Sequence, residues 1–464
     1  TRAQTITLQT TIIGEGDLVK TGKGAVRLLG YTGLQPANRI AGKIDIREGS
    51  LEVSGGETSS TGGLIASRTG EVAGATVWGG GSWALGAADL VVGGAGRGAL
   101  SVTGSEVSTS GKITAGRVIL GRDSSGFGTL TIEGNLGANG QVIASEIAGG
   151  VGGGEMVFRY GVRSSNPFAP KLTGNLAVSV QSGEVVLSGA HDYTGATEIS
   201  GTTAIPSTLV LNGATLANTA VNVRMGGTLG GQGTIGGALN LAGGTLRGAA
   251  GQVMTVGSLA LDQASNVNVA LGAPSATRLF NVVGNLTVDG TLNVTDAGSF
   301  GQGVYRIFDY GGTFTDNGLV VGAMPAGMAG VVQTAIANQV NLVVNGGGGP
   351  VDPVLQFWNG STTTSTGSVK GGAGTWSSGA TTNWTDANGT SESAWGGKFA
   401  VFQGASGVVT VDGAGVAATG MQFAVDGYSL QGGPMSLTGS DGTSVIRVGD
   451  GSAAGAGYTA TIAS

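Results

Sequence analysis

Short bursts of residue alternation, each closed by glycine, constrain the fold of this chain more than any other feature. In one burst, Leu100 and Val102 alternate with Ser101 and Thr103 before Gly104. This alternation puts apolar side chains on one side of an extended strand and polar side chains on the other. Glycine at the end of such a run is typical of a turn. The pattern therefore predicts many short β-strands, each with one buried side.

The bursts recur along the chain at similar distances. Residues 118–134 repeat the pattern of residues 90–104 about thirty residues later, and they place Leu130 and Ile132 at the apolar positions. A repeat of this length is typical of a solenoid, in which each repeat forms one coil. With roughly 20–30 residues per rung, the chain makes roughly twenty rungs. The expected fold is an elongated all-β solenoid.

Helices have little place in this chain. The longest candidate, residues 326–337, contains Gly327, Gly330 and the β-branched Val331 and Val332, which all disfavour a helix. Without helices, parallel strands cannot be joined by helical crossovers, whereas stacked coils join them directly. We therefore expect no substantial helix. A β-sandwich or an up-and-down barrel is the alternative fold.

The composition indicates a folded chain rather than a disordered one. Glycine accounts for 94 of 464 residues and charged residues for 11%, but hydrophobic residues make up 40% and the mean hydropathy is +0.22. A disordered chain has few apolar residues and many charges, because it does not bury enough surface to offset its entropy. The net charge of −6 argues against a nucleic-acid partner. The absence of cysteine excludes disulfides and thiolate metal sites, and the apolar runs are too short to cross a bilayer.

Several stretches are similar to repeats of a known family. Residues 14–33 read GEGDLVKTGKGAVRLLGYTG, and residues 183–199 repeat the second half of that pattern around Tyr193, Thr194 and Gly195. Both resemble the passenger-associated transport repeat of Gram-negative autotransporters. Further stretches similar to autotransporter repeats are 74–134, 226–246, 257–262 and 284–294.

This resemblance implies a passenger domain of type V secretion. It implies that the coils form a right-handed parallel β-helix, and that a C-terminal β-barrel exports the passenger across the outer membrane. The protein is then secreted or exposed at the cell surface. That barrel is absent from this chain, so we expect the chain to be a piece of a longer protein, whose membrane link is the barrel alone.

A glycine and proline run suggests where the chain divides. Residues 1–345 are expected to form one β-helix repeat block, and residues 346–356 form a Gly/Pro-rich junction. Residues 357–464 restart with FWNGS, GTWSS and TNWTD, which resemble the tryptophan-punctuated opening of a new repeat block. We expect this second block to be continuous with the first.

The chain offers few groups for catalysis or metal binding. The single histidine, His191, accompanies no motif that supplies an activated serine, and its place before a turn predicts an exposed loop residue. Calcium-binding nonapeptides need an aspartate where the runs 93–98 and 149–154 carry glycine. Two groups of charged residues are candidates for neighbouring rungs. They are Asp426, Asp441 and Asp450, and separately Arg97, Arg122 and Asp123. Lone charges at glycine turns more often solvate the surface, so we predict no catalytic residue, no metal and no cofactor.

The tryptophans provide the candidate contact surface. They fall in a first cluster of Trp78 and Trp83, and a second cluster of Trp358, Trp376, Trp384 and Trp395. Exposed aromatic residues are enriched at interfaces, which makes the second cluster the candidate ligand-binding surface. Packing of these indoles inside the fold at a rung boundary is the interpretation we favour over a surface role, since an indole buries a large area.

The predicted function is binding rather than catalysis. We expect a non-enzymatic passenger, an adhesin or virulence factor that binds a host protein or a component of the extracellular matrix, with serum and complement factors among the candidates. One alternative is a self-associating scaffold for cell aggregation or biofilm, because open strand edges pair between molecules. A second alternative is a polysaccharide-cleaving β-helix enzyme. The sequence identifies no particular ligand.

Overall fold

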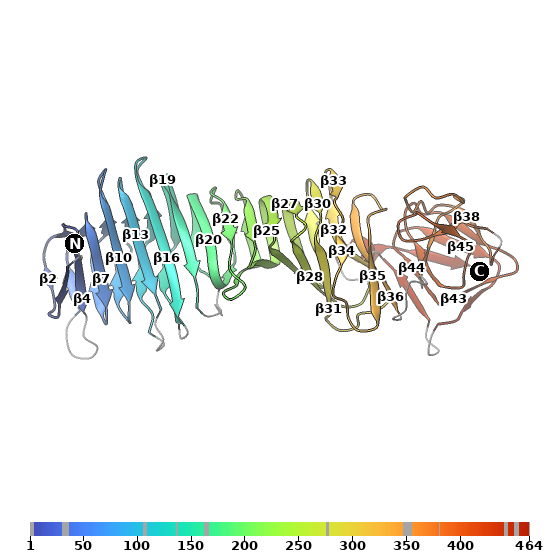
Figure 1. The fold of residues 1–464 in the computed structure, drawn as a ribbon, viewed down its shortest axis with the longest axis horizontal. Helices are drawn as coiled ribbons and strands as arrows, with labels where there is room; N and C mark the ends of the chain where they lie inside the picture. Colours follow the sequence, from blue (N-terminus) through green and yellow to red (C-terminus); the bar gives the residue numbers. More distant parts are fainter. Residues whose placement is uncertain are drawn as a thin grey trace. The chain divides into compact units, whose positions relative to one another are not determined.

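Strands dominate the protein, whose structure is a computed structural model (Figure 1). The structure describes residues 4–29, 37–104, 109–135, 138–161, 167–274, 278–346, 355–379, 381–439, 444–449 and 454–463. Internal contacts divide the chain into two compact units, Thr1–Leu246 and Arg247–Ser464.

In the first unit, the chain passes repeatedly through three rows of strands. We call them the long row, the short row and the third row, and the chain runs through them in that order. The long row consists of β1 (Thr5–Leu8), β4 (Ala25–Leu29), β7 (Gly49–Ser54), β10 (Val72–Trp78), β13 (Arg97–Thr103) and β16 (Phe127–Asn135). The short row consists of β2 (Ile13–Gly14), β5 (Asn38–Ile40), β8 (Glu57–Ser59), β11 (Ser82–Ala84), β14 (Lys112–Thr114) and β18 (Gln141–Ile143). The third row consists of β3 (Leu18–Lys20), β6 (Ile44–Ile46), β9 (Gly63–Ile65), β12 (Leu90–Val92) and β15 (Arg117–Leu120). β19 (Glu146–Arg159) and β20 (Lys171–Leu187) then continue the third and long rows as single strands, and β17 (Ala138–Asn139) pairs antiparallel with β16.

Within each row, every strand pairs in parallel with the strand one coil further along. In the long row, Ala25 lies opposite Ser50 and Arg97 lies opposite Phe127. Figure 1 shows β7, β10, β13 and β16 side by side. This is the pairing that a β-solenoid requires.

The alternating residues of the long row form ladders of similar side chains in the interior. Leu100 lies opposite Leu130 and Val102 opposite Ile132, and all four are buried. Burial of each such side chain contributes about 1.5–3 kcal/mol. The predicted alternation, and the predicted repeat that brings these two strands together, are both confirmed here.

The second residue of each of these two strands is a glycine, which allows a close approach of backbones. Gly98 lies opposite Gly128. A Cβ on Gly98 would overlap with the backbone of Gly93, and a Cβ on Gly128 would overlap with the carbonyl of Val92. Glycine therefore lets the long row begin directly against the end of β12.

After β20 the coils of the first unit become shorter. Gly183 lies opposite Ser207, and Ser207 lies opposite Gly227. The strands are β21 (Ala190–His191), β22 (Thr197–Ile199), β23 (Ser207–Leu216), β24 (Val221–Arg224), β25 (Gly227–Ala242) and β26 (Thr245–Ala249), of which the last begins in this unit.

The Tyr-Thr-Gly turn that drew attention in the sequence has a defined packing role. Tyr193 is buried, and its hydroxyl shares a hydrogen bond of 2.6 Å with Thr197 Oγ1. A Cβ on Gly195 would lie 2.5 Å from the carbonyl oxygen of Leu176 on the previous coil. The tyrosine hydrogen bond therefore holds the turn itself, and Gly195 lets the turn lie against the previous coil, where its N–H donates to the carbonyl of Leu176. The first copy of this motif, at residues 31–33, lies outside the described residues.

The second unit begins with further parallel coils. Met254 lies opposite Phe280, and Phe280 lies opposite Phe308, so the coil length is again close to that of the long row. The strands are β27 (Met254–Leu261), β28 (Asn266–Leu271), β29 (Phe280–Val282), β30 (Leu286–Val288), β31 (Thr291–Asp296), β32 (Gly303–Tyr310), β33 (Phe314–Asp316) and β34 (Val320–Val321).

An antiparallel hairpin follows these coils. β35 (Met328–Gln333) and β36 (Gln339–Gly346) pair with each other, and β36 pairs antiparallel with β32. The hairpin includes most of the segment that was the longest helix candidate, and Val331 and Val332 lie in its first strand. The sequence analysis expected parallel coils throughout and did not predict this reversal. A reversed strand satisfies the edge of β32 that would otherwise be open.

A second set of parallel coils follows, in residues 355–463, which we call the tryptophan block. Its first row consists of β37 (Leu355–Trp358), β41 (Phe399–Phe402), β44 (Gly420–Phe423) and β47 (Val445–Val448). Its second row consists of β38 (Gly374–Trp376), β42 (Val408–Val411), β45 (Tyr428–Gly432) and β48 (Ala460–Ala463). Its third row consists of β43 (Val416–Ala418) and β46 (Met435–Leu437). β39 (Trp384–Thr385) and β40 (Glu392–Ser393) extend the first row antiparallel.

The hairpin and the tryptophan block share an apolar contact crossed by buried amides. Gln333 Nε2 donates to Gln403 Oε1 at 2.9 Å, and Asn341 Nδ2 donates to Gln333 Oε1 at 2.9 Å. Arg306 extends the chain of bonds through Asn341 Oδ1 at 3.0 Å. The buried apolar residues around it are Val304, Ile336, Val343, Leu355, Phe357, Val369, Phe399 and Val401. Amides that satisfy one another inside an apolar contact fix its geometry.

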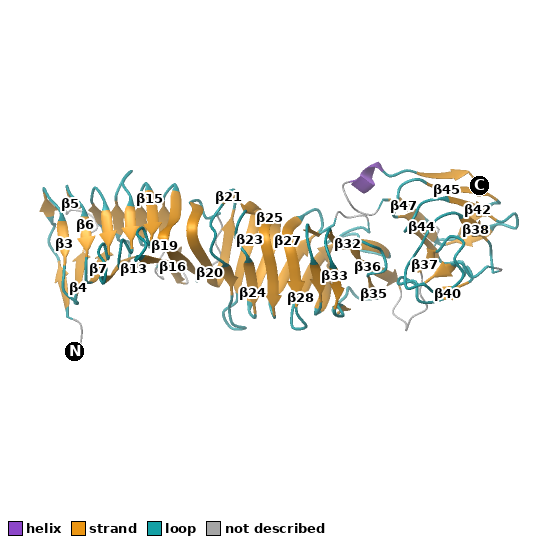
Figure 2. Cartoon of the chain, turned by 90° about the horizontal axis from the view of Figure 1, so that it is seen from above, coloured by secondary structure: helices purple, strands orange, loops and turns teal. Residues whose placement is uncertain are grey.

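The all-β prediction is confirmed for the described residues. Their one helical element is a 3-10 turn, η2 (Ala454–Gly457), drawn in purple in Figure 2. Residues 347–354, most of the expected junction at 346–356, lie outside the described residues, and the division of the chain at that junction stays a prediction.

Candidate functional site

The four tryptophans of the second cluster lie together inside the tryptophan block. Trp358, Trp376 and Trp384 have no exposed surface, and Trp395 is 6% exposed. The ring centroids of Trp384 and Trp395 are 4.2 Å apart, and those of Trp376 and Trp384 are 5.1 Å apart. Trp358 Nε1 donates to the carbonyl of Gly372 at 2.8 Å. These indoles are the core of the block.

The candidate role of these four indoles as an exposed contact surface is therefore wrong, and the favoured interpretation, packing inside the fold, holds for all four. Phe402, Phe423 and Tyr428 surround them and complete an aromatic interior. Each aromatic side chain buries about 150–250 Å² on packing, which strongly favours the interior over water. Trp358, Trp376 and Trp384 lie in β37, β38 and β39, and all three side chains are buried.

The two tryptophans of the first cluster differ from each other. Trp83 is buried in the short row, and its Nε1 donates to Ser60 Oγ at 3.0 Å. Trp78 is 37% exposed, the largest exposed fraction of the six tryptophans. It ends β10, where the alternation of the strand directs every second residue outward.

Trp78 belongs to a group of side chains on the outer side of the long row. Arg27 Nε donates to Glu52 Oε2 at 2.7 Å, and the guanidinium carbon of Arg27 lies 5.3 Å from the centroid of the Trp78 ring. A cation over an indole at this distance is attracted to the ring. In the register of the long row, Arg27 lies opposite Glu52. Thr76 of β10 lies opposite Glu52, and Ser101 of β13 lies opposite Thr76, so the line continues through two hydroxyl residues. We call this group the Trp78 platform; its residues are Arg27, Glu52, Thr76, Trp78 and Ser101.

The floor beside the indole is made of small residues. In β10 and β13, Gly74 lies opposite Ala99, and Thr76 lies opposite Ser101. The Ser101 hydroxyl is 3.3 Å from the Thr103 hydroxyl. The sequence analysis missed this platform. The register of the coils would have revealed it, because that register places Arg27, Glu52 and Thr76 in one line.

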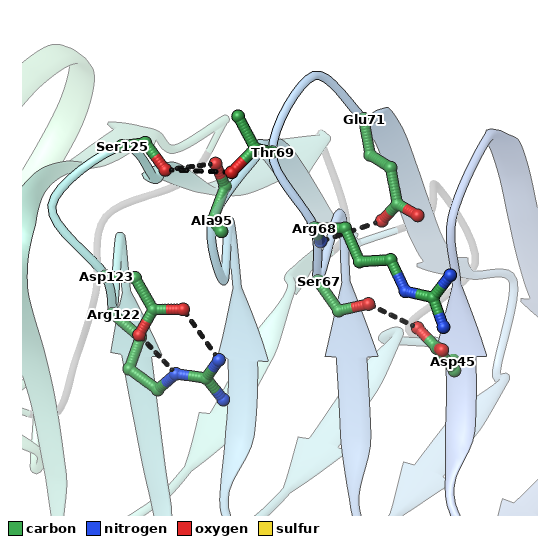
Figure 3. A network of polar contacts seen from close by, with 9 residues as sticks. All are labelled: Asp45, Ser67, Arg68, Thr69, Glu71, Ala95, Arg122, Asp123 and Ser125. Atoms are coloured by element: carbon green, nitrogen blue, oxygen red, sulfur yellow. Dashed lines mark hydrogen bonds and ion pairs between the residues drawn. The ribbon is translucent and has the colours of Figure 1, made fainter.

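A second polar region lies where the third row turns into the long row (Figure 3). Ser67 donates to Asp45 Oδ1 of the previous coil at 3.0 Å. Ser125 donates to the carbonyl of Ala95 at 2.9 Å, and its hydroxyl is 3.4 Å from that of Thr69, two coils away. These contacts join the turns of successive coils, so this edge acts as a polar seam along the first unit.

The predicted grouping of Arg97 with Arg122 and Asp123 forms only in part. Arg122 and Asp123 make a two-bond ion pair, with N–O distances of 2.9 and 2.8 Å, which lowers the pKa of Asp123 and raises that of Arg122. Arg97 lies in β13 between Val72 and Phe127 on the neighbouring strands, and the described residues show no ion pair between it and Asp123. The grouping therefore supplies no free carboxylate for acid–base chemistry.

His191 is buried, so the prediction that it is an exposed loop residue is wrong. It is 2% exposed and lies in β21, where Ala190 and His191 pair with β23. Its Nδ1 accepts from the backbone N–H of Leu172 at 3.2 Å, which leaves Nε2 to donate to the carbonyl of Ser188 at 3.1 Å. Burial lowers the pKa of His191, and the positive charge of Lys171 lowers it further. The neutral ring is a structural link between coils.

Of the three aspartates grouped for glycan cleavage, Asp426 alone lies among the described residues, so that grouping stays a prediction. Asp426 Oδ1 accepts from the backbone N–H of Thr459 at 2.6 Å. Hydrogen bonds from the backbone and the side chain of Thr459 lower the pKa of Asp426. Asp441 and Asp450 lie outside the described residues. Nowhere in the described ranges do three His, Cys, Asp or Glu side chains come together as a metal site requires. Nor does any described helix have the length and hydropathy needed to cross a membrane.

Stacked parallel coils with ladders of aliphatic side chains are compatible with the β-solenoid of a secreted passenger. No protein-family model matches the chain. The chain is 44% identical over 225 residues to the adhesin BmaC autotransporter of Brucella suis biovar 1 (strain 1330). The matched part is 46% of this chain and 6% of the Brucella adhesin, so the chain spans a small part of that relative.

This identity confirms the predicted resemblance to an autotransporter passenger domain. The predicted export across the outer membrane to the cell surface is supported by this relative and stays a prediction for this chain. The individual transport repeats stay a prediction.

Proposed function

We propose that this chain is part of the exposed passenger of a surface adhesin and acts without catalysis. The observation that carries the proposal is the 44% identity over 225 residues to the Brucella adhesin. The partner we propose is a component of the host surface or of the extracellular matrix, including host proteins of serum and the complement system. Because the chain matches 6% of the relative, the role of the whole relative comes to this chain by inference.

The coil stack supports this function. We propose that the coils wind as a right-handed parallel β-helix of roughly twenty rungs, because connections between parallel strands are right-handed in about 98% of known cases. A solenoid presents long faces built from side chains of many coils. Such faces suit the binding of an extended ligand better than the enclosure of a small substrate.

The two alternative functions have less support. A self-associating scaffold would give sedimentation that depends on protein concentration, and a polysaccharide-cleaving enzyme would release reducing sugars from a substrate panel. The described residues offer neither alternative a specific observation in its favour. For the enzyme, two of the candidate carboxylates are already engaged, because Asp123 is paired with Arg122 and Asp426 accepts a hydrogen bond from Thr459.

Adhesion of coated beads tests the proposed function. Beads that carry the purified 464-residue chain are applied to decellularised matrix from cultured host cells and to immobilised serum proteins. We expect several-fold more retained beads than with the same chain after heat unfolding. Equal retention of folded and unfolded chain on every surface would contradict the proposal.

A further inference from the structure

The Trp78 platform has the chemistry of a sugar-binding site. We propose that it binds one neutral pyranose unit of a host glycan, with the sugar lying flat on the outer side of β7, β10 and β13. This inference rests on the proposed function, because it names the ligand class for that adhesin surface. It follows from four features of the platform.

The first feature is the indole itself. Trp78 is 37% exposed, whereas the other five tryptophans are at most 6% exposed. An exposed indole is a rigid apolar plane with little side-chain entropy to lose on binding. A pyranose has one face of C–H groups of matching size. Stacking of that face on the indole would cover the apolar surface that the fold leaves in water.

The second feature is the open floor beside the ring. Gly74 and Ala99 lie opposite each other, with Thr76 and Ser101 next along the same strands. No long side chain rises from these four positions. A flat ligand therefore reaches both the indole and the two hydroxyl groups.

The third feature is the pair of charged groups at the border. Glu52 uses Oε2 for Arg27, and Oε1 has no partner within the described part of the chain. A carboxylate accepts from sugar hydroxyls, and a guanidinium donates to them. Because Arg27 and Glu52 neutralise each other, the platform favours an uncharged ligand over a carboxylated sugar.

The fourth feature argues against a peptide ligand. An extended peptide binds a sheet by adding a strand at an open edge. The backbone of β10 is already paired on both sides, with β7 and with β13. A ligand at Trp78 therefore has side chains but no free strand edge to recognise, which suits a sugar.

Arg27 is the positioning residue of the platform. It spans from β4 across β7 to β10, since it contacts both Glu52 and the ring of Trp78. This contact fixes the orientation of the indole before any ligand arrives. Loss of the guanidinium would weaken binding by releasing the ring, while the folded strands remain.

A glycan array and tryptophan quenching test the inference on the full chain. The wild-type chain, Trp78→Ala and Val72→Ala are compared; Val72 is an exposed residue at the other end of the same strand, β10. We expect the wild type to bind glycans with terminal neutral hexoses, and Trp78→Ala to bind them about tenfold more weakly. Val72→Ala should bind like the wild type. Equal melting temperatures of the three proteins establish that each is folded.

Quenching by acrylamide gives a readout that needs no variant. Five indoles are buried, so quenching of the wild-type chain reports mainly on Trp78. A bound glycan from the array should protect this fluorescence. Absence of glycan binding by the wild type, equal binding by Trp78→Ala, or no protection would overturn the inference.

Bead retention separates this inference from the proposed function. If the wild type adheres to host matrix but binds no glycan, the adhesin proposal stands and the sugar platform is wrong. If the wild type binds glycans but is not retained on any host surface, the platform stands and the adhesin proposal is wrong.

Discussion

The interiors of the first unit and of the tryptophan block are built in different ways. In the long row of the first unit, successive coils have similar lengths, and the interior consists mainly of aliphatic ladders. In the tryptophan block, Leu355 lies opposite Phe399 and Phe399 lies opposite Gly420, so the first of these coils is much longer than the second. Its interior contains four indoles and three other aromatic rings, packed among aliphatic residues such as Val409 and Leu430.

The comparison shows how coil length governs the core. Coils of similar length stack similar side chains, because each inward position recurs one coil later. In the tryptophan block, Phe402 and Phe423 still stack one coil apart. The extra length of the coil between Leu355 and Phe399 adds Trp376, Trp384 and Trp395, and these large rings fill the interior beside that stack. The first interior depends on many small contacts, whereas the second depends on a few large ones.

The largest effect is expected for Trp384→Ala in the tryptophan block. The Trp384 ring contacts those of Trp358, Trp376 and Trp395, with centroids 4.2 to 5.2 Å away. Removal of a buried aromatic ring costs about 3–5 kcal/mol. Urea denaturation followed by hydrogen exchange should show loss of protection across β37, β38 and β41 together. A cost below about 1 kcal/mol would contradict the idea that a few rings hold this block.

A matched pair sharpens this prediction. Trp384 Nε1 is buried and has no hydrogen-bond partner among the described atoms, whereas Trp395 Nε1 donates to the carbonyl of Ala417 at 2.8 Å. Trp384→Phe should therefore destabilise the block less than Trp395→Phe, since only the second change leaves a carbonyl unpaired.

In the first unit, Leu130→Ala should cost about 2–5 kcal/mol, typical of a buried leucine. The effect should stay local, because each coil of a solenoid contacts only its neighbours. Hydrogen exchange should rise in β13, β16 and β19 and remain unchanged in β4. Uniform loss of protection through the unit would show that its coils unfold as one.

The amides between the hairpin and the tryptophan block should have a smaller effect. Gln333→Leu removes the partner of Gln403 and Asn341, and a buried polar group without a partner costs about 1–3 kcal/mol. Val331→Ala, at an exposed position on the same strand, is the control and should change little. The urea midpoint of the second unit measures both variants. Equal urea midpoints of Gln333→Leu and Val331→Ala would show that the amides do not stabilise this contact.

The stability of the first unit should depend on pH through His191. In the folded chain the ring is held neutral, and its pKa is lowered by burial. The unfolded chain takes up a proton near the ordinary value of 6.5, which the folded chain resists. Stability is therefore full above about pH 6.5 and falls as the pH decreases.

Urea midpoints between about pH 7.5 and 5.5 check this dependence, in a range above the titration of most carboxylates. His191→Gln should reduce the slope. Lys171 and Asp192, which lie near the ring, are left unchanged in both chains. An unchanged slope in His191→Gln would assign the dependence to other groups.

The smallest effect is expected at the polar seam. Arg122→Ala removes an ion pair in which both side chains are 44% exposed, and exposed pairs contribute about 0–1 kcal/mol. Thermal unfolding in low and high salt measures it. A larger loss would mean that the seam stabilises the coils as a network.

The sequence predicted the first unit better than the tryptophan block, for a physical reason. Alternation and a near-constant offset are local signals, and they were enough to pair Leu100 with Leu130. The four indoles carry no such signal, because the coils around them differ in length. Their burial depends on contacts between residues far apart in the chain, such as Trp358 with Phe402.

Other features were hidden for related reasons. The hairpin of β35 and β36 contains Gly330 and two adjacent valines, which rule out a helix but do not reveal the direction of pairing. His191 is next to a polar residue and a turn, yet the pairing of β21 with β23 buries it. The Trp78 platform combines side chains from several coils, and only the register of those coils brings them together.

The most direct test of the central claim, that this chain binds a host surface through its folded coils, is competition in the bead assay. Beads coated with the chain are applied to host matrix in the presence of increasing free folded chain. The account predicts retention that falls in a saturable way as free chain is added, and that is unaffected by the same amount of unfolded chain. Retention that does not fall when folded competitor is added, or that never exceeds the background, would contradict the claim.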